Sequence, residues 1–130
     1  MPWPRVLLID DSRTAQAAFG IGLEDAGFEV LVAGDAMEAL DILAQRRCAL
    51  VLADYQLPGA NGLDLLAAWR GAYPDAPLIL DSASMTPELA GQARDFGVAA
   101  VLEKPVSPGR LVEVVQAALN GRGGVREGKW

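Results

Sequence analysis

The chain has 130 residues, the length of a single domain, and its net charge of −6 and pI near 4.5 argue against binding to nucleic acid. It contains no histidine and one cysteine, which excludes histidine-based acid–base catalysis, a phosphohistidine carrier and an internal disulfide. A metal site must then use oxygen ligands, so the candidate ions are Mg²⁺, Mn²⁺ and Ca²⁺. No apolar run approaches the roughly 20 residues that span a bilayer, and the first residues do not resemble a secretory signal. We therefore expect a cytoplasmic protein that does not enter a membrane.

Five apolar segments predict strands. The first, 6–9, is continuous, and the second, 28–32, alternates between apolar and polar residues. The other three, at 49–53, 78–80 and 99–102, are again continuous. Continuous runs are typical of strands buried on both faces of a parallel sheet, whereas alternation suits a strand at the edge of a sheet.

Helix-start signals lie between these strands. Asp35 followed by Glu38 is similar to a capping box, and a hydroxyl residue precedes proline at 86–87 and at 107–108. Apolar stripes at helical spacing follow the first and the last of these starts: Ala36, Leu40 and Leu43, then Leu111, Val114, Val115, Ala118 and Leu119. Glycines stand where helices should end, at 27, 97 and 121.

Strand and helix therefore alternate five times, which predicts one α/β domain over residues 4–120. Its parallel sheet would have five strands and helices on both faces, a doubly wound arrangement. Right-handed crossovers favour the strand order 2-1-3-4-5 of flavodoxin-like folds, in which ligands bind at the carboxyl ends of the strands. The glycine-rich residues 121–130 are expected to form a flexible tail.

The residues that could carry chemistry all follow predicted strands: Asp10 and Asp11, Asp54, Asp81 and Ser82, and Lys104 with Pro105. Four of the five strands are neighbours in the proposed order. Three carboxylates, those of Asp10, Asp11 and Asp54, should therefore meet the Ser82 hydroxyl and the Lys104 ammonium in one crevice. Two carboxylates about 4 Å apart repel by roughly 4 kcal/mol at an effective dielectric near 20. A divalent cation offsets that repulsion, and oxygen ligands favour Mg²⁺, with Mn²⁺ as a second choice. Capping of the first helix alone would need only one of the two adjacent acids.

Within this crevice the residue types suggest phosphoryl transfer. The carboxylate of Asp54 can attack phosphorus and form an acyl phosphate, and Lys104 can neutralise charge on the transferred group. Ser82 can donate a hydrogen bond to a phosphoryl oxygen, or it can serve a turn at the strand end. We expect Asp81 to turn to solvent as a strand-end residue; added repulsion in the site and contact with a partner are the alternatives.

These motifs resemble the receiver domains of bacterial two-component response regulators, of the CheY-like single-domain kind. The resemblance covers about residues 4–120. It consists of the acidic pair 10–11, then Asp54 in the pattern Asp-x-x-Leu-Pro-x-x-x-Gly, which includes Pro58 and Gly62. Ser82-Ala83 and Lys104-Pro105 follow in order. Four such motifs at this spacing are far more specific than any one of them.

The resemblance implies that Asp54 receives a phosphoryl group from a histidine kinase or a histidine phosphotransferase. The domain would be a signalling switch, not an enzyme, and would act on a downstream protein target by contact. The resemblance also implies Mg²⁺ ligation by Asp11, Asp54 and the main-chain carbonyl of Gln56, with Asp10 acting partly through water.

The resemblance further implies that Ser82 and Lys104 contact the phosphoryl group and that the Lys104–Pro105 peptide bond is cis. The chain departs from the family pattern at Val101, where many receivers carry tyrosine or phenylalanine. Without that aromatic ring, we expect phosphorylation to move Ser82 and the loop 83–85 instead of flipping a ring.

Two other functions stay open at this stage. One is a receiver-like interaction module that no longer needs phosphorylation, which the missing aromatic residue favours. The other is an Mg²⁺-dependent phosphatase, but such hydrolases typically need a second acid two residues after the nucleophile, where this chain has Gln56. A Gly-x-x-x-x-Gly-Lys-Ser/Thr loop for nucleotide phosphates does not occur in the sequence.

Overall fold

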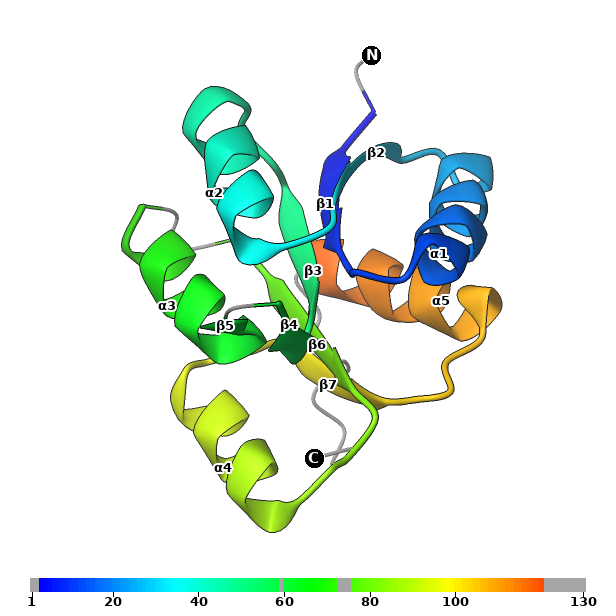
Figure 1. The fold of residues 1–130 in the computed structure, drawn as a ribbon. Coiled ribbons are helices and arrows are strands. Elements are labelled where there is room, and N and C mark those ends of the chain that lie inside the picture. Colours follow the sequence, from blue (N-terminus) through cyan, green and yellow to red (C-terminus); the bar gives the residue numbers. More distant parts are fainter. Residues whose placement is uncertain (1–2, 59, 73–75, 121–130) are drawn as a thin grey trace.

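A parallel sheet of five strands lies at the centre of the computed structural model, which describes residues 3–58, 60–72 and 76–120 (Figure 1). The elements in chain order are β1 (Arg5–Ile9), α1 (Arg13–Asp25), β2 (Glu29–Ala33), α2 (Ala36–Gln45), β3 (Leu50–Asp54), β4 (Gln56–Leu57), β5 (Ala60–Asn61), α3 (Gly62–Ala72), β6 (Leu78–Ser82), α4 (Pro87–Asp95), β7 (Ala100–Glu103) and α5 (Pro108–Leu119). The sheet order is β2-β1-β3-β6-β7. This is the predicted order of the five long strands, so the predicted doubly wound fold is confirmed.

Each face of the sheet has its own hydrophobic core. In β1, Leu7 and Ile9 pack with residues of α2, α3 and α4, whereas Val6 and Leu8 pack with residues of α1 and α5. Figure 1 shows these two groups of helices on opposite sides of the sheet. All five residues of β3 and of β6 are buried. Because helices cover both faces, the inner strands are continuously apolar up to the point where the site begins.

Side-chain caps begin four of the helices. The residues Ser12, Asp35, Thr86 and Ser107 each accept a hydrogen bond from the backbone N–H three residues later. The Glu38 carboxylate accepts from the N–H of Gly34 at 2.8 Å, so the cap of α2 reaches one residue further back than an ordinary capping box. Helices α1 and α4 are followed by glycines with φ of +98° and +74°, Gly27 and Gly97.

Two details of the fold differ from the sequence prediction. The hairpin β4–β5, in which Gln56 pairs with Asn61, was not predicted. Helix α2 turns Ala39 and Leu43 to the core and leaves Leu40 40% exposed, so the predicted stripe was wrong at that position. The predicted helix end at residue 121 and the tail 121–130 lie outside the described residues. Within the described part of the chain, every helix is too short or too polar to cross a membrane.

Candidate functional site

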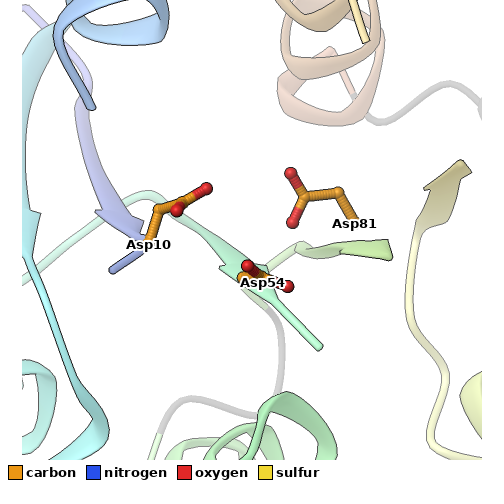
Figure 2. Close-up of side chains that lie close together, drawn as sticks. All are labelled: Asp10, Asp54 and Asp81. Atoms are coloured by element: carbon orange, nitrogen blue, oxygen red, sulfur yellow. The ribbon is translucent and has the colours of Figure 1, made fainter. Parts of the chain in front are cut away.

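Three aspartates form a row across neighbouring strands at the carboxyl edge of the sheet. Asp54 on β3 lies opposite Asp81 on β6, and Asp10 directly follows Ile9, which lies opposite Ala53. Asp10, Asp54 and Asp81 are only 1%, 6% and 2% exposed. One carboxylate oxygen of each residue lies within 4.8 Å of those of the other two. Figure 2 shows the three carboxyl groups close together, on three different segments of the chain.

Hydrogen bonds hold two of these carboxylates in place. Asp10 Oδ1 accepts from the backbone N–H of Ser12 at 2.9 Å, and Asp54 Oδ1 accepts from that of Gln56 at 3.0 Å. Asp54 Oδ2 accepts from Lys104 Nζ at 2.9 Å, and the same ammonium lies 4.0 Å from Asp10 Oδ2. Two buried oxygens, Asp10 Oδ2 and Asp81 Oδ1, have no hydrogen-bond partner. Buried polar atoms normally have one, so each of these two oxygens calls for a ligand or a proton.

Burial makes this cluster unfavourable for negative charge. It raises the pKa of Asp10, and it raises the pKa of Asp81 to about 7; the Lys104 ammonium opposes both shifts, and the Asp54 carboxylate adds to them. Burial also disfavours the charged form of Lys104. The hydrogen bond to Asp54 and the surrounding carboxylates outweigh that effect, so the pKa of Lys104 is raised. One ammonium thus faces three carboxyl groups, an excess of negative charge that a divalent cation would neutralise.

Asp81 corrects the sequence prediction. It was expected to turn to solvent beyond a strand ending at Leu80, but β6 continues to Ser82 and buries Asp81 beside Asp54. The signal was present in the sequence, because an aspartate directly follows the apolar run of the first, third and fourth strands alike. Asp81 is therefore a site residue that sequence reasoning missed.

Asp11 lies apart from this row. Asp11 is exposed, and it is not among the three clustered carboxylates. The side chain of Gln56 is also exposed, while the backbone N–H of Gln56 contacts Asp54. Of the four residues predicted to hold the metal, the structure therefore brings together Asp10 and Asp54, places Gln56 beside them, and leaves Asp11 at the rim.

Ser82 is the last residue of β6, and Lys104 directly follows β7. The Ser82 hydroxyl is buried; it donates to the carbonyl of Ser84 at 2.9 Å and accepts from its N–H at 3.1 Å. The backbone N–H of Lys104 donates to the carbonyl of Ser82 at 2.8 Å, and the Lys104–Pro105 peptide bond is cis. Lys104 therefore contacts Asp54, whereas the Ser82 hydroxyl is bound to its own loop.

Gly62 brings the start of α3 close to the end of β3. A Cβ at this position would lie 2.7 Å from the carbonyl oxygen of Asp54 and 2.8 Å from Leu80 Cδ1, so only glycine fits without a shift. Its N–H donates to the carbonyl of Tyr55 at 2.6 Å. Pro58, in the intervening turn, is exposed, and Val101, at the position of the missing aromatic residue, is buried in the core beneath α4.

The donor set fits a hard divalent cation. Its atoms are all oxygens, two of them have no hydrogen-bond partner, and the carboxylates lie within 4.8 Å of one another. Mg²⁺ and Mn²⁺ prefer such ligands.

Known proteins provide an independent comparison. The family described as the response regulator receiver domain matches residues 6–116. The response regulator protein FleR of Pseudomonas aeruginosa is 33% identical over 111 residues, and the C4-dicarboxylate transport transcriptional regulatory protein DctD of Rhizobium meliloti is 36% identical over 115 residues. These alignments cover 85% and 88% of this chain but 24% and 25% of the relatives, so the chain spans about a quarter of their length.

Solved receiver structures have the same fold over nearly their whole length. A CheY-like receiver domain protein from Methanospirillum hungatei has a TM-score of 0.87 at 28% identity, covering 92% of this chain and 95% of that one. The chemotaxis response regulator CheY4 of Vibrio cholerae has a TM-score of 0.83 at 28% identity, with 89% and 98% covered. The sequence match over residues 6–116, together with this fold, shows that the chain belongs to the response regulator receiver domain family.

Proposed function

We propose that this domain is a phospho-accepting switch of a two-component or phosphorelay system, with Asp54 as the acceptor and Mg²⁺ as the cofactor. One observation carries this assignment. Asp54 lies in the middle of the aspartate row, between two carboxyl groups that each have an unpartnered oxygen, and 2.9 Å from the Lys104 ammonium. A nucleophile, a cation-binding site and a fixed positive charge thus share one pocket.

In this scheme the chain supplies positioning and charge. Asp10, Asp11, Asp54 and the Gln56 carbonyl would hold Mg²⁺, which when bound supplies positive charge against the oxygens of the transferred group. A carboxylate oxygen of Asp54 attacks phosphorus as the bond from phosphorus to the donor's histidine nitrogen breaks. Lys104 then moves its hydrogen bond from the carboxylate to a phosphoryl oxygen.

The phosphoryl donor would be a histidine kinase or a histidine phosphotransferase, and the output a contact with a downstream protein. A domain of net charge −6 is poorly suited to binding nucleic acid. Cys48 is a buried free thiol, which suits a reducing compartment such as the cytoplasm. The chain spans about a quarter of FleR and DctD, so regulatory roles named for those proteins also depend on parts outside the match.

Acetyl phosphate provides the test of the assignment. With Mg²⁺, the wild-type protein is expected to gain the mass of one phosphoryl group, and with EDTA in place of Mg²⁺ it is expected to gain none. No gain in either condition would favour a module that works without phosphorylation. Rapid release of inorganic phosphate from an added phosphoester, over many turnovers, would favour a phosphatase.

The contacts of Ser82 suggest how the signal leaves the pocket. When the hydroxyl turns to a phosphoryl oxygen, it must release the carbonyl of Ser84, two residues before the N-cap Thr86 of α4. Each new charge-assisted hydrogen bond is worth about 1.5–3 kcal/mol. That is enough to shift a two-state equilibrium by one or two orders of magnitude. Val101 has no ring to flip, so loop 83–85 and α4 are the route.

Nuclear magnetic resonance can follow this route. Upon addition of beryllium fluoride and Mg²⁺, we expect backbone amide shifts at Ser84, Met85 and the first turn of α4, beyond those of the aspartates. The Ser82→Ala variant should lose most of the α4 shifts while still binding the phosphoryl mimic. Shifts confined to the pocket in the wild-type protein would contradict this mechanism.

A further inference from the structure

Asp81 is a buried acid that the proposed phosphoryl chemistry does not use. It is 2% exposed, and its Oδ1 has no hydrogen-bond partner. Figure 2 shows its carboxyl group extending from β6 toward Asp10 and Asp54. An unpaired carboxylate in such a position is strongly unfavourable, so Asp81 must meet a proton or a positive charge.

The neighbouring side chains do not meet this need. Lys104 binds Asp54 at 2.9 Å and approaches Asp10 at 4.0 Å, while no ion pair within 4.0 Å joins it to Asp81 in the part of the chain that the structure describes. The Ser82 hydroxyl donates to Ser84 and is not free to donate to Asp81. Lys104 acts on Asp81 only at longer range, so the partner that binds Asp81 Oδ1 directly must be a proton or a cation that enters the pocket from solution.

We propose that Asp81 is an additional carboxylate ligand of the divalent cation, binding it through Oδ1 beside Asp10 and Asp54; this rests on the proposed cation site. Oxygens on one octahedral Mg²⁺ lie about 3 Å apart when adjacent and about 4.2 Å apart when opposite, given the usual Mg–O distance of about 2.1 Å. The carboxylate oxygens lie within 4.8 Å of one another, so each pair reaches such a spacing by closing at most about 2 Å. The added ligand charge would make this pocket bind its cation more tightly than a pocket with an apolar residue in place of Asp81.

Cation binding to the unphosphorylated protein tests this role without any reaction. We would titrate Mn²⁺ by electron paramagnetic resonance at pH 8, where Asp81 is mostly ionised. We expect the Kd to rise about tenfold in Asp81→Asn, equivalent to about 1.4 kcal/mol. The matched control is Glu103→Gln, since Glu103 is exposed and lies opposite Ser82 at the end of β7. It should change the Kd less than about twofold, because an exposed charge is screened by solvent.

A second readout separates ligation from a general loss of charge. Line broadening in ¹⁷O-enriched water counts the water ligands of bound Mn²⁺. The variant for this readout is Asp81→Val, because valine suits a buried strand position and has no oxygen to ligate the ion, whereas the amide oxygen of asparagine could still do so. Asp81→Val should have one more water ligand than the wild type. An unchanged water count in Asp81→Val, or equal weakening by Glu103→Gln, would overturn the role of Asp81.

The same experiment separates the two proposals. If the wild-type protein binds Mn²⁺ and accepts a phosphoryl group while Asp81→Asn binds Mn²⁺ equally well, only the role of Asp81 fails. If the wild-type protein neither binds Mn²⁺ nor accepts a phosphoryl group, the proposed function fails, and the role of Asp81 fails with it.

Discussion

Replacing Asp54 with asparagine is expected to abolish phosphoryl uptake from acetyl phosphate completely. The amide keeps the size of the side chain and an oxygen that can accept from the Gln56 N–H, so the loop after β3 should keep its shape. It lacks the negative charge and the nucleophilicity of the carboxylate, and no acyl phosphate can form. Intact mass after incubation with Mg²⁺ and acetyl phosphate should show only the unmodified Asp54→Asn protein.

The control for this loss is an acid of the same type away from the pocket. Asp41 is exposed on α2, and Asp41→Asn should gain one phosphoryl group as the wild type does. A phosphoryl group on Asp54→Asn would place the acceptor elsewhere in the row, on Asp10 or Asp81. The double variants Asp54→Asn/Asp10→Asn and Asp54→Asn/Asp81→Asn would then identify it.

The sequence predicted the fold because its local signals and its periodicity agree. Continuous apolar runs marked the buried strands, and Asp35, Thr86 and Ser107 marked helix starts that the structure contains. The hairpin β4–β5 was not predicted because strands of two residues have no periodicity to detect. Leu40 was misplaced because Ala39 and Leu40 are adjacent, and helical spacing alone fits either of them on the same face as Leu43. Packing against the sheet decides which of the two is buried, and it buries Ala39.

The candidate site was predictable for a different reason. Strand ends in a parallel sheet meet at one edge, so Asp10, Asp54 and Lys104 could be grouped from order and spacing alone. Asp81 follows its apolar run as Asp10 and Asp54 follow theirs, but its burial depends on whether β6 ends at Leu80 or two residues later. Strand boundaries are set by pairing with neighbouring strands, here Asp81 with Asp54, and a single sequence does not display that pairing.

A proton and a metal ion are expected to compete for this pocket. With all three carboxyl groups ionised, Lys104 neutralises one charge and two remain in a buried space. Without a cation, protonation of Asp81 relieves the repulsion. Burial, with the neighbouring carboxylates of Asp54 and Asp10, accordingly raises the pKa of Asp81 to about 7, although Lys104 opposes the shift. A divalent cation would bring the same relief while leaving every oxygen available as a ligand. Asp81 would thus destabilise the metal-free protein while improving the binding of the cation. Functional sites often lower stability in this way.

This competition predicts an unusual pH dependence of stability in EDTA. A carboxyl group whose pKa is higher in the folded state than in the unfolded state binds more protons when folded, so folding becomes less stable as pH rises. For Asp81 the loss of folding stability should begin near pH 4, where the carboxyl group ionises in the unfolded state, and it should level off above about pH 7. A shift of the pKa from 3.8 to about 7 corresponds to roughly 4 kcal/mol.

The contribution of Asp81 is isolated by comparing the wild type with Asp81→Asn in urea unfolding between pH 4 and pH 8. Asparagine carries no charge at any pH, so the free energy of unfolding of the variant relative to the wild type should rise across this range. At pH 8 the variant should be the more stable protein by several kcal/mol, and added Mg²⁺ should narrow the gap by stabilising the wild type more. If the free energies of unfolding of the variant and the wild type differ by the same amount from pH 4 to pH 8, Asp81 is not the group that titrates.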